Sequence, residues 1–390
     1  MSPRADTHWP EPGPDALAHS ERLAGLIAGR IAEAGGWLSF ADYMALALYA
    51  PGLGYYAAGA RKFGAAGDFV TAPELTPLFA RSLAVQAVEV LDACGNEILE
   101  LGAGSGRLAV DLMQELARFG RLPDRYAILE PSPDLRQRQQ ALFEREAPEL
   151  LERVHWLDTL PDQLSGLVIG NEVLDALPVH LVRWLDGHAF ERGVALDEAG
   201  STFVWQDRPM LPGPLLDATN LLPAPGDGYL SEICLAAPAL IHSLAERLQQ
   251  GMLLFLDYGF PRAEYYHPDR REGTLMCHYR HRAFDDPFYL PGLVDITAHV
   301  DFTLIADAAL EASLDVLGYT SQAHFLLNCG LLDRLNELEP GTTAYLKETA
   351  RVQKLIQPTE MGELFKVIAL GKGDVPLPLG FARGDKRHTL

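Results

Sequence analysis

Basic residues and cysteines are scarce in this chain. Lysine and arginine number 32 against 53 aspartates and glutamates, so the formal charge of the 390 residues is −21. A surface of that sign repels phosphate backbones and anionic lipid headgroups, which argues against nucleic acid or a membrane surface as the partner. It favours a basic protein segment or a cationic small molecule instead.

Long apolar runs and processing signals are also missing. No uninterrupted run reaches the roughly 18 to 20 residues of a membrane span, so we expect no membrane insertion. Residues 1–19 are proline-rich and acidic, unlike a signal or transit peptide, and we expect them to be disordered. None of the four cysteines forms a C-x-x-C pair, which indicates a reducing compartment. Together these features predict a cytoplasmic protein.

The segment 98–106, Ile-Leu-Glu-Leu-Gly-Ala-Gly-Ser-Gly, is the most informative stretch of the chain. An apolar run that ends in an acid and leads into three alternating glycines predicts a buried strand, a tight turn and a helix start. Arg107 stands where a GxGxxG loop needs its third glycine, and a P-loop lysine is absent. What remains is the E/D-x-G-x-G-x-G pattern of S-adenosylmethionine (SAM) methyltransferases. The alternative is an ordinary glycine-rich turn.

Strand and helix patterns alternate after this loop. We expect strands at 97–101, 126–130, 154–156, 166–170 and 252–257, and helices at 108–119, 133–147 and 237–250. Such alternation predicts an α/β fold with a doubly wound, Rossmann-like parallel sheet, as in class I SAM methyltransferases. The remaining expected elements are helices near 302–317 and 342–356 and strands near 319–326 and 364–370.

The chain divides into segments of different character. A disordered tail (1–19) and a helical cap with a glycine-rich loop (20–75) precede the core (76–373), and a mobile tail (374–390) follows it. Two insertions interrupt the core: a β meander at about 182–230, and an irregular segment at 260–300 rich in Tyr, His, Arg and Pro, whose composition favours a substrate-binding surface.

Polar residues stand at the carboxyl ends of the predicted strands, where ligands of open α/β sheets bind. Glu130 ends the second strand and is placed to accept both ribose hydroxyls of a nucleoside; a helix cap or a surface acid is the alternative. After the third strand, Trp156 and Asp158 are placed to bracket an adenine. A core tryptophan and an exposed aspartate explain that pair nearly as well.

Two acids follow the fourth strand at a spacing of three residues. Glu172 and Asp175 share one face of an opening helical turn, where the loop faces the sulfonium methyl group of a cofactor in this topology. Capping of a helix N-terminus is the alternative role. Asp257 and Tyr258 follow the fifth strand, just before the second insertion, and we expect them on the substrate side.

Four segments carry a resemblance to a known family: Gly-Asp-Phe-Val-Thr-Ala-Pro-Glu at 67–74, the glycine loop at 100–106, Asn-Glu-Val-Leu-Asp-Ala-Leu-Pro-Val-His at 171–180, and Asp-Ile-Thr-Ala-His-Val-Asp-Phe at 295–302. In this order they resemble the MidA-like family of SAM-dependent methyltransferases, from about residue 23 to residue 370. Family members tend to carry Gly-Pro-Gly-Arg-Gly in the first loop, where this chain has the more general Gly-Ala-Gly-Ser-Gly. Mitochondrial members are complex I assembly factors linked to symmetric dimethylation of an arginine in a complex I subunit.

The resemblance implies SAM as the cofactor and a protein arginine as the methyl acceptor, with a respiratory complex I subunit as a candidate substrate. A guanidinium is always charged, so its methylation demands carboxylates that clamp it and accept a proton. The expected catalytic residues are Asp68, Asn171, Glu172 and Asp175. The expected cofactor-binding residues are Thr71, Pro73, Glu74, Glu100, Gly102, Gly104, Gly106, Glu130, Asp158 and Asn171. The expected substrate-side residues are Asp257, Tyr258, His278, Arg280, His299 and Asp301.

We expect no metal site. Cys277, His278 and His281 lie close together in the sequence but lack the spacing of standard metal ligands. Two other functions stay open beside a protein arginine methyltransferase: a small-molecule methyltransferase of the same fold, and a non-catalytic assembly factor that binds SAM. Paired acids after the fourth strand argue against the last of these, because a pure scaffold has no need for them there.

Overall fold

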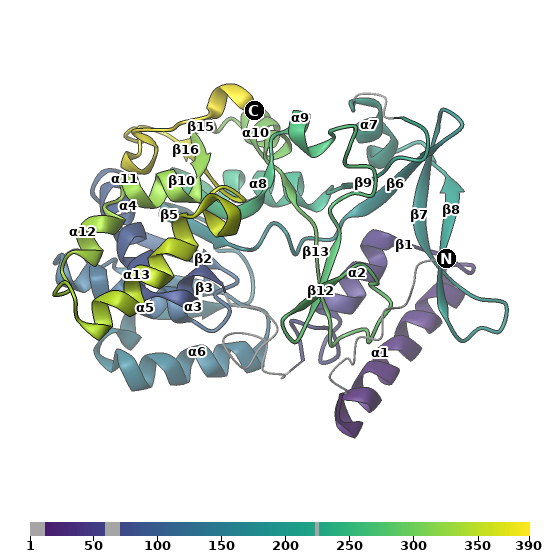
Figure 1. The fold of residues 1–390 in the computed structure, drawn as a ribbon, viewed down its shortest axis with the longest axis horizontal. Coiled ribbons are helices and arrows are strands. Elements are labelled where there is room, and N and C mark those ends of the chain that lie inside the picture. The colour runs from purple at the N-terminus through teal and green to yellow at the C-terminus, as the bar shows by residue number, and fades with distance from the viewer. Residues whose placement is uncertain (1–11, 59–70, 223–225) are drawn as a thin grey trace.

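A computed structural model describes residues 12–58, 71–222 and 226–390 (Figure 1). Its central sheet has the strand order β15-β16-β10-β5-β2-β3-β4, and the short β14 (Val300–Asp301) pairs with β10. The parallel strands are β2 (Glu97–Leu101), β3 (Arg125–Leu129), β4 (Val154–Leu157), β5 (Leu164–Asn171) and β10 (Leu248–Phe260). Antiparallel to β10 is β16 (Phe365–Lys372), which in turn pairs with β15 (Asp315–Ser321). The doubly wound, mostly parallel sheet expected from the sequence is confirmed.

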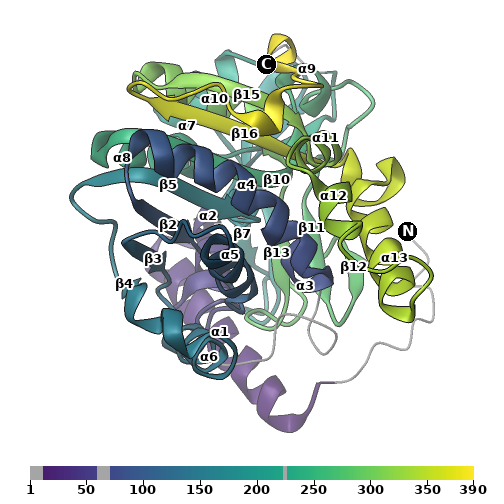
Figure 2. The same ribbon diagram turned by 90° about the vertical axis from the view of Figure 1, so that its left-hand side faces the viewer.

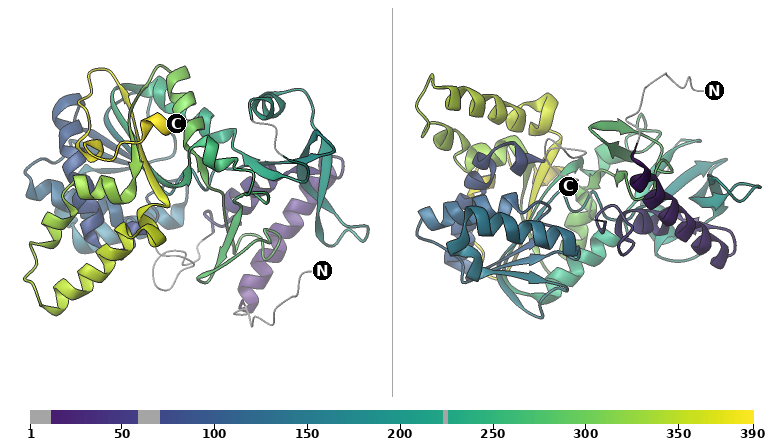
Figure 3. Two further views of the ribbon diagram at one scale, coloured as in Figure 1. Left: turned by 45° about the horizontal axis from the view of Figure 1, so that its top comes forward. Right: turned by 90° about the horizontal axis from the view of Figure 1, so that it is seen from below.

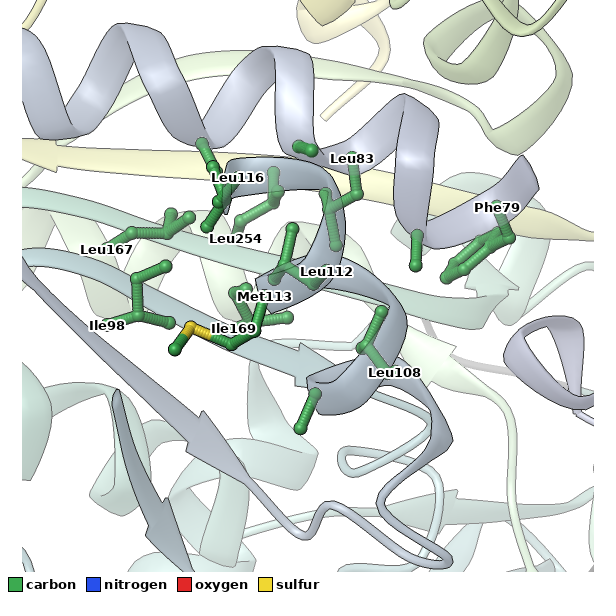
Figure 4. Close-up of a cluster of buried hydrophobic side chains, with 14 of the residues drawn as sticks. Phe79, Leu83, Ile98, Leu108, Leu112, Met113, Leu116, Leu167, Ile169 and Leu254 are labelled. Carbon is green, nitrogen blue, oxygen red and sulfur yellow. The ribbon is translucent and has the colours of Figure 1, made fainter. Parts of the chain in front are cut away.

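Helices cover both faces of this sheet (Figure 2). One face carries α4 (Pro77–Cys94), α5 (Arg107–Arg118), α6 (Pro133–Glu146), α11 (Gln322–Asn328), α12 (Leu331–Leu335) and α13 (Thr343–Ile356). The other carries α8 (Ala236–Arg247) and α10 (Phe302–Glu311). Successive strand residues point to opposite faces, so Ile98 packs under α4 and α5 while Leu99 packs on the other side. Figure 4 shows Leu83 of α4 and Leu112 of α5 above Ile98.

A second part of the molecule lies beside the sheet and contains the N-terminal helices (Figures 1 and 3). It comprises α1 (Pro14–Glu33), β1 (Leu38–Ser39), α2 (Phe40–Tyr49), β6 (His180–Leu185), β7 (His188–Leu196), β8 (Phe203–Pro209), α7 (Pro214–Asn220) and β9 (Leu230–Ile233). A smaller sheet in the order β12-β11-β13 is made of β11 (Met276–Tyr279), β12 (Arg282–Phe284) and β13 (Asp295–Thr297). One apolar cluster joins α1 and α2 to residues of β7, β11 and β13. The cap and both insertions therefore pack together.

The remaining helical turns are short. They are α3 (Ala72–Leu75), η1 (Pro148–Arg153), α9 (Arg262–Tyr265), η2 (Pro358–Gly362), η3 (Leu379–Phe381) and η4 (Arg387–Thr389). Within the described residues, no helix combines the length and apolarity that crossing a membrane requires.

Several expectations for the chain ends and the second insertion are wrong. Residues 14–19 belong to α1, whose start is favoured by a proline in its first turn and by Asp15, whereas residues 1–11 lie outside the described part. The strand expected at 319–326 ends at Ser321, because that side chain caps α11 by accepting the His324 N–H. The segment 260–300 is not irregular throughout, since it forms the β11–β13 sheet.

The C-terminal segment is folded against the core rather than mobile. Phe381 is 6% exposed and packs edge-to-face on Phe325. The Gly380 N–H donates to the buried Gln86 side chain (2.9 Å), and the Asn328 side chain donates to the Gly380 carbonyl (2.9 Å). These contacts attach the segment 379–381 to α4 and α11.

Candidate active site

A cavity of about 900 Å³ opens at the carboxyl ends of the parallel strands. The loop after β2, the end of β3 and the turn after β5 line it on the side of the central sheet. Tyr49 of α2, Tyr56 and residues of β11 and β13 line the opposite side. The volume lies in the upper part of the range of small-molecule sites, roughly 300–1,000 Å³. The cavity is thus large enough for one large ligand or two smaller ones.

Three glycines with positive φ form the turn between β2 and α5. The φ angles of Gly102, Gly104 and Gly106 are 58°, 54° and 86°, in the region that favours glycine. Gly102 and Gly104 line the cavity, and the Gly102 N–H donates to the Leu129 carbonyl (3.1 Å). Gly106 is the N-cap of α5 and does not line the cavity; a side chain there would meet Gln139 at 3.1 Å. Two of the expected glycines therefore expose backbone to a ligand, and the third allows α5 to pack on α6.

Two buried acids lie beside this turn, at the ends of neighbouring strands. Glu100 accepts a hydrogen bond from the Tyr126 hydroxyl (2.8 Å), and burial raises its pKa to about 7. Glu130 accepts from the Ser132 N–H (3.0 Å) and from the Gln139 side chain (3.2 Å). Both residues line the cavity, as does Glu74, whose carboxylate accepts from the Ser105 hydroxyl.

Gln139 of α6 is a buried residue that sequence reasoning did not single out. The Trp156 indole N–H donates to its side-chain oxygen (2.8 Å). Because an indole nitrogen only donates, this bond decides which end of the amide faces the loop. The Gln139 amide nitrogen then donates to the Gly104 carbonyl (2.9 Å) and to Glu130 (3.2 Å). In the sequence, Gln139 lies at helical spacing between the apolar Leu135 and Phe143, and a polar residue at such a buried position was the available signal for it. Through its two hydrogen bonds, Gln139 positions both the glycine loop and Glu130.

Glu172 occupies a turn with unusual backbone geometry directly after β5. Its φ of 53° is uncommon for a residue with a side chain. The Asn171 amide donates to its carboxylate (3.2 Å), and the backbone of Ala72 makes a second hydrogen bond. Burial, and then the negative charges of Asp175 and Asp295, raise its pKa to about 8. The residue lines the cavity, and strained backbone of this kind clusters at functional sites.

Asp175 lies on the same wall of the cavity. The Tyr258 hydroxyl donates to its Oδ2 atom at 2.5 Å, and burial raises its pKa to about 6. Its other oxygen, Oδ1, is buried without a hydrogen-bond partner among the described residues, although the residue is only 5% exposed. Buried carboxylate oxygens rarely lack a donor. The residue lines the cavity, and the backbone N–H groups of Asp175 and Ala176 partly offset the effect of burial on its pKa.

Asp257 has a supporting role rather than the expected place on the substrate side. Its Oδ2 atom accepts the backbone N–H groups of Val173 (3.0 Å), Leu174 (2.8 Å) and Asp175 (3.3 Å). Oδ1 accepts from the Tyr258 N–H (3.0 Å), and the side chain does not line the cavity. Three N–H groups on one oxygen fix the turn that carries both acids, so Asp257 holds Asp175 in place through the backbone.

Four other expected site residues lie away from the cavity or outside the described residues. Asp158 is 87% exposed in its side chain and pairs with Arg136 (2.7 Å). Asp301 caps α10 by accepting the N–H groups at 303 and 304, which explains its burial. Arg280 lies over the Tyr279 ring, 5.2 Å from its centroid, and does not line the cavity. Asp68 falls in 59–70, outside the described residues.

The structure brings Tyr258, His278 and His299 to the cavity as expected, together with Asn171, Thr71 and Pro73. His299 is packed edge-on against Tyr258, and burial lowers its pKa to about 4, so the ring is uncharged at neutral pH. Sequence reasoning missed Tyr49, Tyr56 and Asp295 as cavity residues. Asp295 opens the fourth family segment, which was the one available signal for it.

The Cys277 region is part of an apolar core. Cys277 is fully buried in the cluster that joins α1 and α2 to β11, and burial raises the pKa of its thiol. In 12–58, 71–222 and 226–390, no group of three or more His, Cys, Asp or Glu residues has an arrangement that could hold a metal ion.

The residues at the sheet edge fit SAM. Gly102 and Gly104 leave the backbone accessible, and the Glu130 carboxylate is held in place by two donors. Asn171 lines the cavity beside these residues, and its side-chain oxygen is buried without a hydrogen-bond partner in the described residues. A cofactor with an ammonium group and a ribose diol supplies donors of the required kind.

Comparison with known structures agrees with this fit. Residues 82–320 match a family model described as S-adenosyl-L-methionine-dependent methyltransferase. A Burkholderia thailandensis protein, crystallised with S-adenosyl-homocysteine, is 50% identical with a TM-score of 0.94, and the match covers 98% of this chain and 100% of that one. A second crystal structure from that organism has the same identity and coverage and a TM-score of 0.91.

Curated relatives include the mitochondrial protein arginine methyltransferase NDUFAF7 of Danio rerio, 28% identical, with 86% of this chain and 83% of that protein covered. The Drosophila melanogaster homologue is 29% identical, with 93% and 89% covered. Both relatives are mitochondrial by name, which overturns the expectation of a cytoplasmic protein. The family match, the 50% identical structures and the cavity together show that this chain belongs to the MidA-like family of SAM-dependent methyltransferases.

Proposed function

We propose that this methyltransferase acts on an arginine of a protein substrate, with a respiratory complex I subunit as the candidate. The observation that carries the proposal is the pair of adjacent buried acids, Glu172 and Asp175, that line a cavity with room for an acceptor next to the cofactor. A guanidinium is always charged and carries five N–H donors, which suits two adjacent carboxylates. The names of relatives 28–29% identical to this chain support the same acceptor.

We assign the cofactor to the half of the cavity formed by the central sheet. The proposed residues are Thr71, Pro73, Glu74, Glu100, Gly102, Gly104, Glu130 and Asn171, all of which line it. When bound, SAM supplies an electrophilic methyl group. The protein contributes alignment of the acceptor, exclusion of water and a place for the proton that the acceptor loses.

The two acids have different roles toward the acceptor: one binds its charge and the other accepts its proton. Asp175, held by Tyr258, has the lower pKa of the pair, about 6, and is the ionised anchor for the guanidinium at neutral pH. Glu172, with a pKa of about 8, is the stronger base and accepts the proton that leaves the methylated nitrogen. His299 stays uncharged beside them, so it does not repel the cation.

The pH dependence of kcat/KM for the acceptor tests this division. In the free enzyme Glu172 is protonated below its pKa of about 8, and a protonated carboxyl attracts a cation less well. We expect kcat/KM to rise with pH between about 6 and 8 and to level off above that range. Burial, and then the charges of Asp175 and Asp295, keep the pKa of Glu172 high.

In the Glu172→Gln variant, kcat/KM should no longer rise near pH 8. It should rise only near pH 6, where Asp175 ionises. A wild-type profile that is flat from pH 6 to 9 would contradict the assignment of Glu172 as the proton acceptor.

Glu130 should contribute strongly to cofactor affinity. As the proposed partner of the ribose diol it accepts two charge-assisted hydrogen bonds, each worth about 1.5–3 kcal/mol. We expect Glu130→Ala to weaken SAM binding at least about tenfold in isothermal titration calorimetry. Glu144→Ala, which removes an exposed acid of the same helix region, is the matched control. Equal affinity of the wild type for SAM and its 2′-deoxy analogue would count against this role.

The function itself is tested with a cell extract. Extract proteins from a strain that lacks this enzyme are incubated with purified enzyme and methyl-labelled SAM, and labelled residues are identified by mass spectrometry. Label on arginine, absent with a Glu172→Gln, Asp175→Asn double variant, supports the proposal. Label confined to small molecules identifies a small-molecule methyltransferase. SAM binding with no label in either fraction identifies a non-catalytic assembly factor.

A further inference from the structure

Two arginines line the described part of the cavity, and their surroundings differ. Arg107 is neutralised by ion pairs with Asp111 (2.6 Å) and Glu146 (2.5 Å). Arg270 lies in the loop that follows α9. Within the described residues no carboxylate forms an ion pair with it, and its Nε atom is buried without a hydrogen-bond partner. Arg270 is therefore a cavity cation that this part of the protein does not neutralise.

The ring of Phe260 fixes the guanidinium of Arg270. The guanidinium carbon lies 4.2 Å from the ring centroid, and both residues line the cavity. A guanidinium stacked on an aromatic ring keeps its N–H groups for hydrogen bonds. Glu264 and Asp269 share a smaller hollow of about 420 Å³ with Arg270, and Asp269 lies 3.7 Å from the His267 ring. The aromatic contact, rather than an acid, sets where this cation lies.

A row of aromatic rings separates Arg270 from the two acids after β5. Phe260 contacts His299, and His299 contacts Tyr258, each edge-on with centroids 5.2 Å apart. The Tyr258 hydroxyl donates to Asp175 at the far end of this row. Arg270 repels a guanidinium and the acids attract one, so the two places favour groups of opposite charge. An extended peptide spans about 3.3–3.6 Å per residue, so groups a few residues apart reach both.

We propose that Arg270 binds a carboxylate of the methyl acceptor and that Phe260 is its positioning residue. The proposal builds on the proposed arginine acceptor and adds to it an acidic side chain within a few residues of the methylated arginine. A guanidinium binds a carboxylate through two parallel N–H groups, a geometry that an ammonium group cannot reproduce. Glu172 and Asp175 then bind the positive group of the substrate segment, and Arg270 binds its negative group.

The test uses short acetylated and amidated peptides that contain one arginine and one glutamate, with the glutamate at each of the three positions on either side. Every peptide has a partner in which glutamine replaces the glutamate. Binding to enzyme saturated with S-adenosyl-homocysteine is measured by isothermal titration calorimetry. We expect at least one glutamate peptide to bind at least about tenfold more tightly than its glutamine partner. Arg270→Gln should remove this preference and leave the affinity for S-adenosyl-homocysteine within about twofold.

Three further variants separate charge from position. Arg270→Lys keeps the charge but not the paired N–H groups, so we expect it to retain a preference of about two- to threefold. Phe260→Leu should lower the preference about threefold by weakening the glutamate peptide alone, whereas a merely structural role would weaken both peptides alike. Arg271→Gln is the matched control, because Arg271 is exposed, donates to the Asp227 carbonyl and does not line the cavity. It should bind every peptide like the wild type.

Two results would overturn the role of Arg270. One is the absence of any preference for glutamate in the wild type. The other is a loss of affinity for S-adenosyl-homocysteine in Arg270→Gln, because Arg270 would then belong to the cofactor. A preference for free arginine over N-acetyl-arginine amide that Arg270→Gln removes would assign the carboxylate to a small acceptor and overturn the acidic side chain.

The arginine acceptor is tested separately with peptides in which glutamine replaces the arginine. If they bind as tightly as the arginine peptides, the proposed arginine specificity fails. A glutamate preference that still depends on Arg270 in those peptides would establish the carboxylate site without it.

Discussion

Replacing Gly104 by valine is expected to abolish detectable SAM binding, a loss of at least about a hundredfold, in a protein that still folds. Gly104 has a φ of 54° and lines the cavity, so a branched side chain would strain the backbone and project where we place the cofactor. Strain at one such position costs of order 1–3 kcal/mol, less than the total stability of a typical domain. Calorimetric titration with SAM and a thermal melt measure the two effects.

Gly200→Val is the matched control for strain. Gly200 has a φ of 71° in the turn between β7 and β8, and nothing lies within 4 Å of the place a side chain would take. We expect this variant to lose a similar amount of stability and no SAM affinity. Unchanged SAM affinity in Gly104→Val would show that the cofactor is wrongly placed.

Removing the charge of either acid after β5 is expected to lower turnover at least about a hundredfold while SAM affinity stays near the wild-type value. Asp175→Asn keeps the size of the side chain, but its amide offers the guanidinium only one uncharged acceptor. Truncating one partner of a buried charge pair costs about 2–5 kcal/mol, and that loss falls on the acceptor rather than the cofactor. Glu172→Gln should behave similarly, because it removes the proposed proton acceptor.

The double variant should be little worse than either single variant, because residues that act as a unit give non-additive effects. Methyl transfer to labelled protein substrate is measured together with SAM titration on the same preparations. Near wild-type turnover in the double variant would show that the acids only cap the turn. Asp295, with Glu74, would then be the next residues to test.

The central sheet was predictable because each strand leaves a local signature. Residues 98–101 are apolar except for Glu100, as in buried parallel strands, and β2 has the expected bounds of 97–101. The end of β15 was not predictable from hydrophobicity, since apolar residues continue past Ser321 at Ala323, Phe325 and Leu326. The side chain of Ser321 caps the N-terminus of α11, and the chain therefore continues as a helix rather than as a strand.

Site residues were predictable where the chemistry sits at a strand end, and were missed where the fold brings distant segments together. Glu130, Glu172 and Asp175 follow strands directly and all reach the cavity. The hydrogen bond between Tyr56 and Asp295 joins residues 239 positions apart, and no local pattern indicates it. Asp301 lies away from the cavity because its carboxylate has structural partners: it caps α10 and forms an ion pair with Arg262 (3.4 Å).

Glutamate in a left-handed conformation at position 172 lowers the stability of the folded state. Glycine would adopt the same φ without the penalty of order 1–3 kcal/mol, but it has no carboxyl group. Selection for thermal stability alone would therefore drive this position towards glycine. A screen that ranks variants of this enzyme by melting temperature would favour loss of the carboxyl group at position 172, whatever that group contributes to turnover.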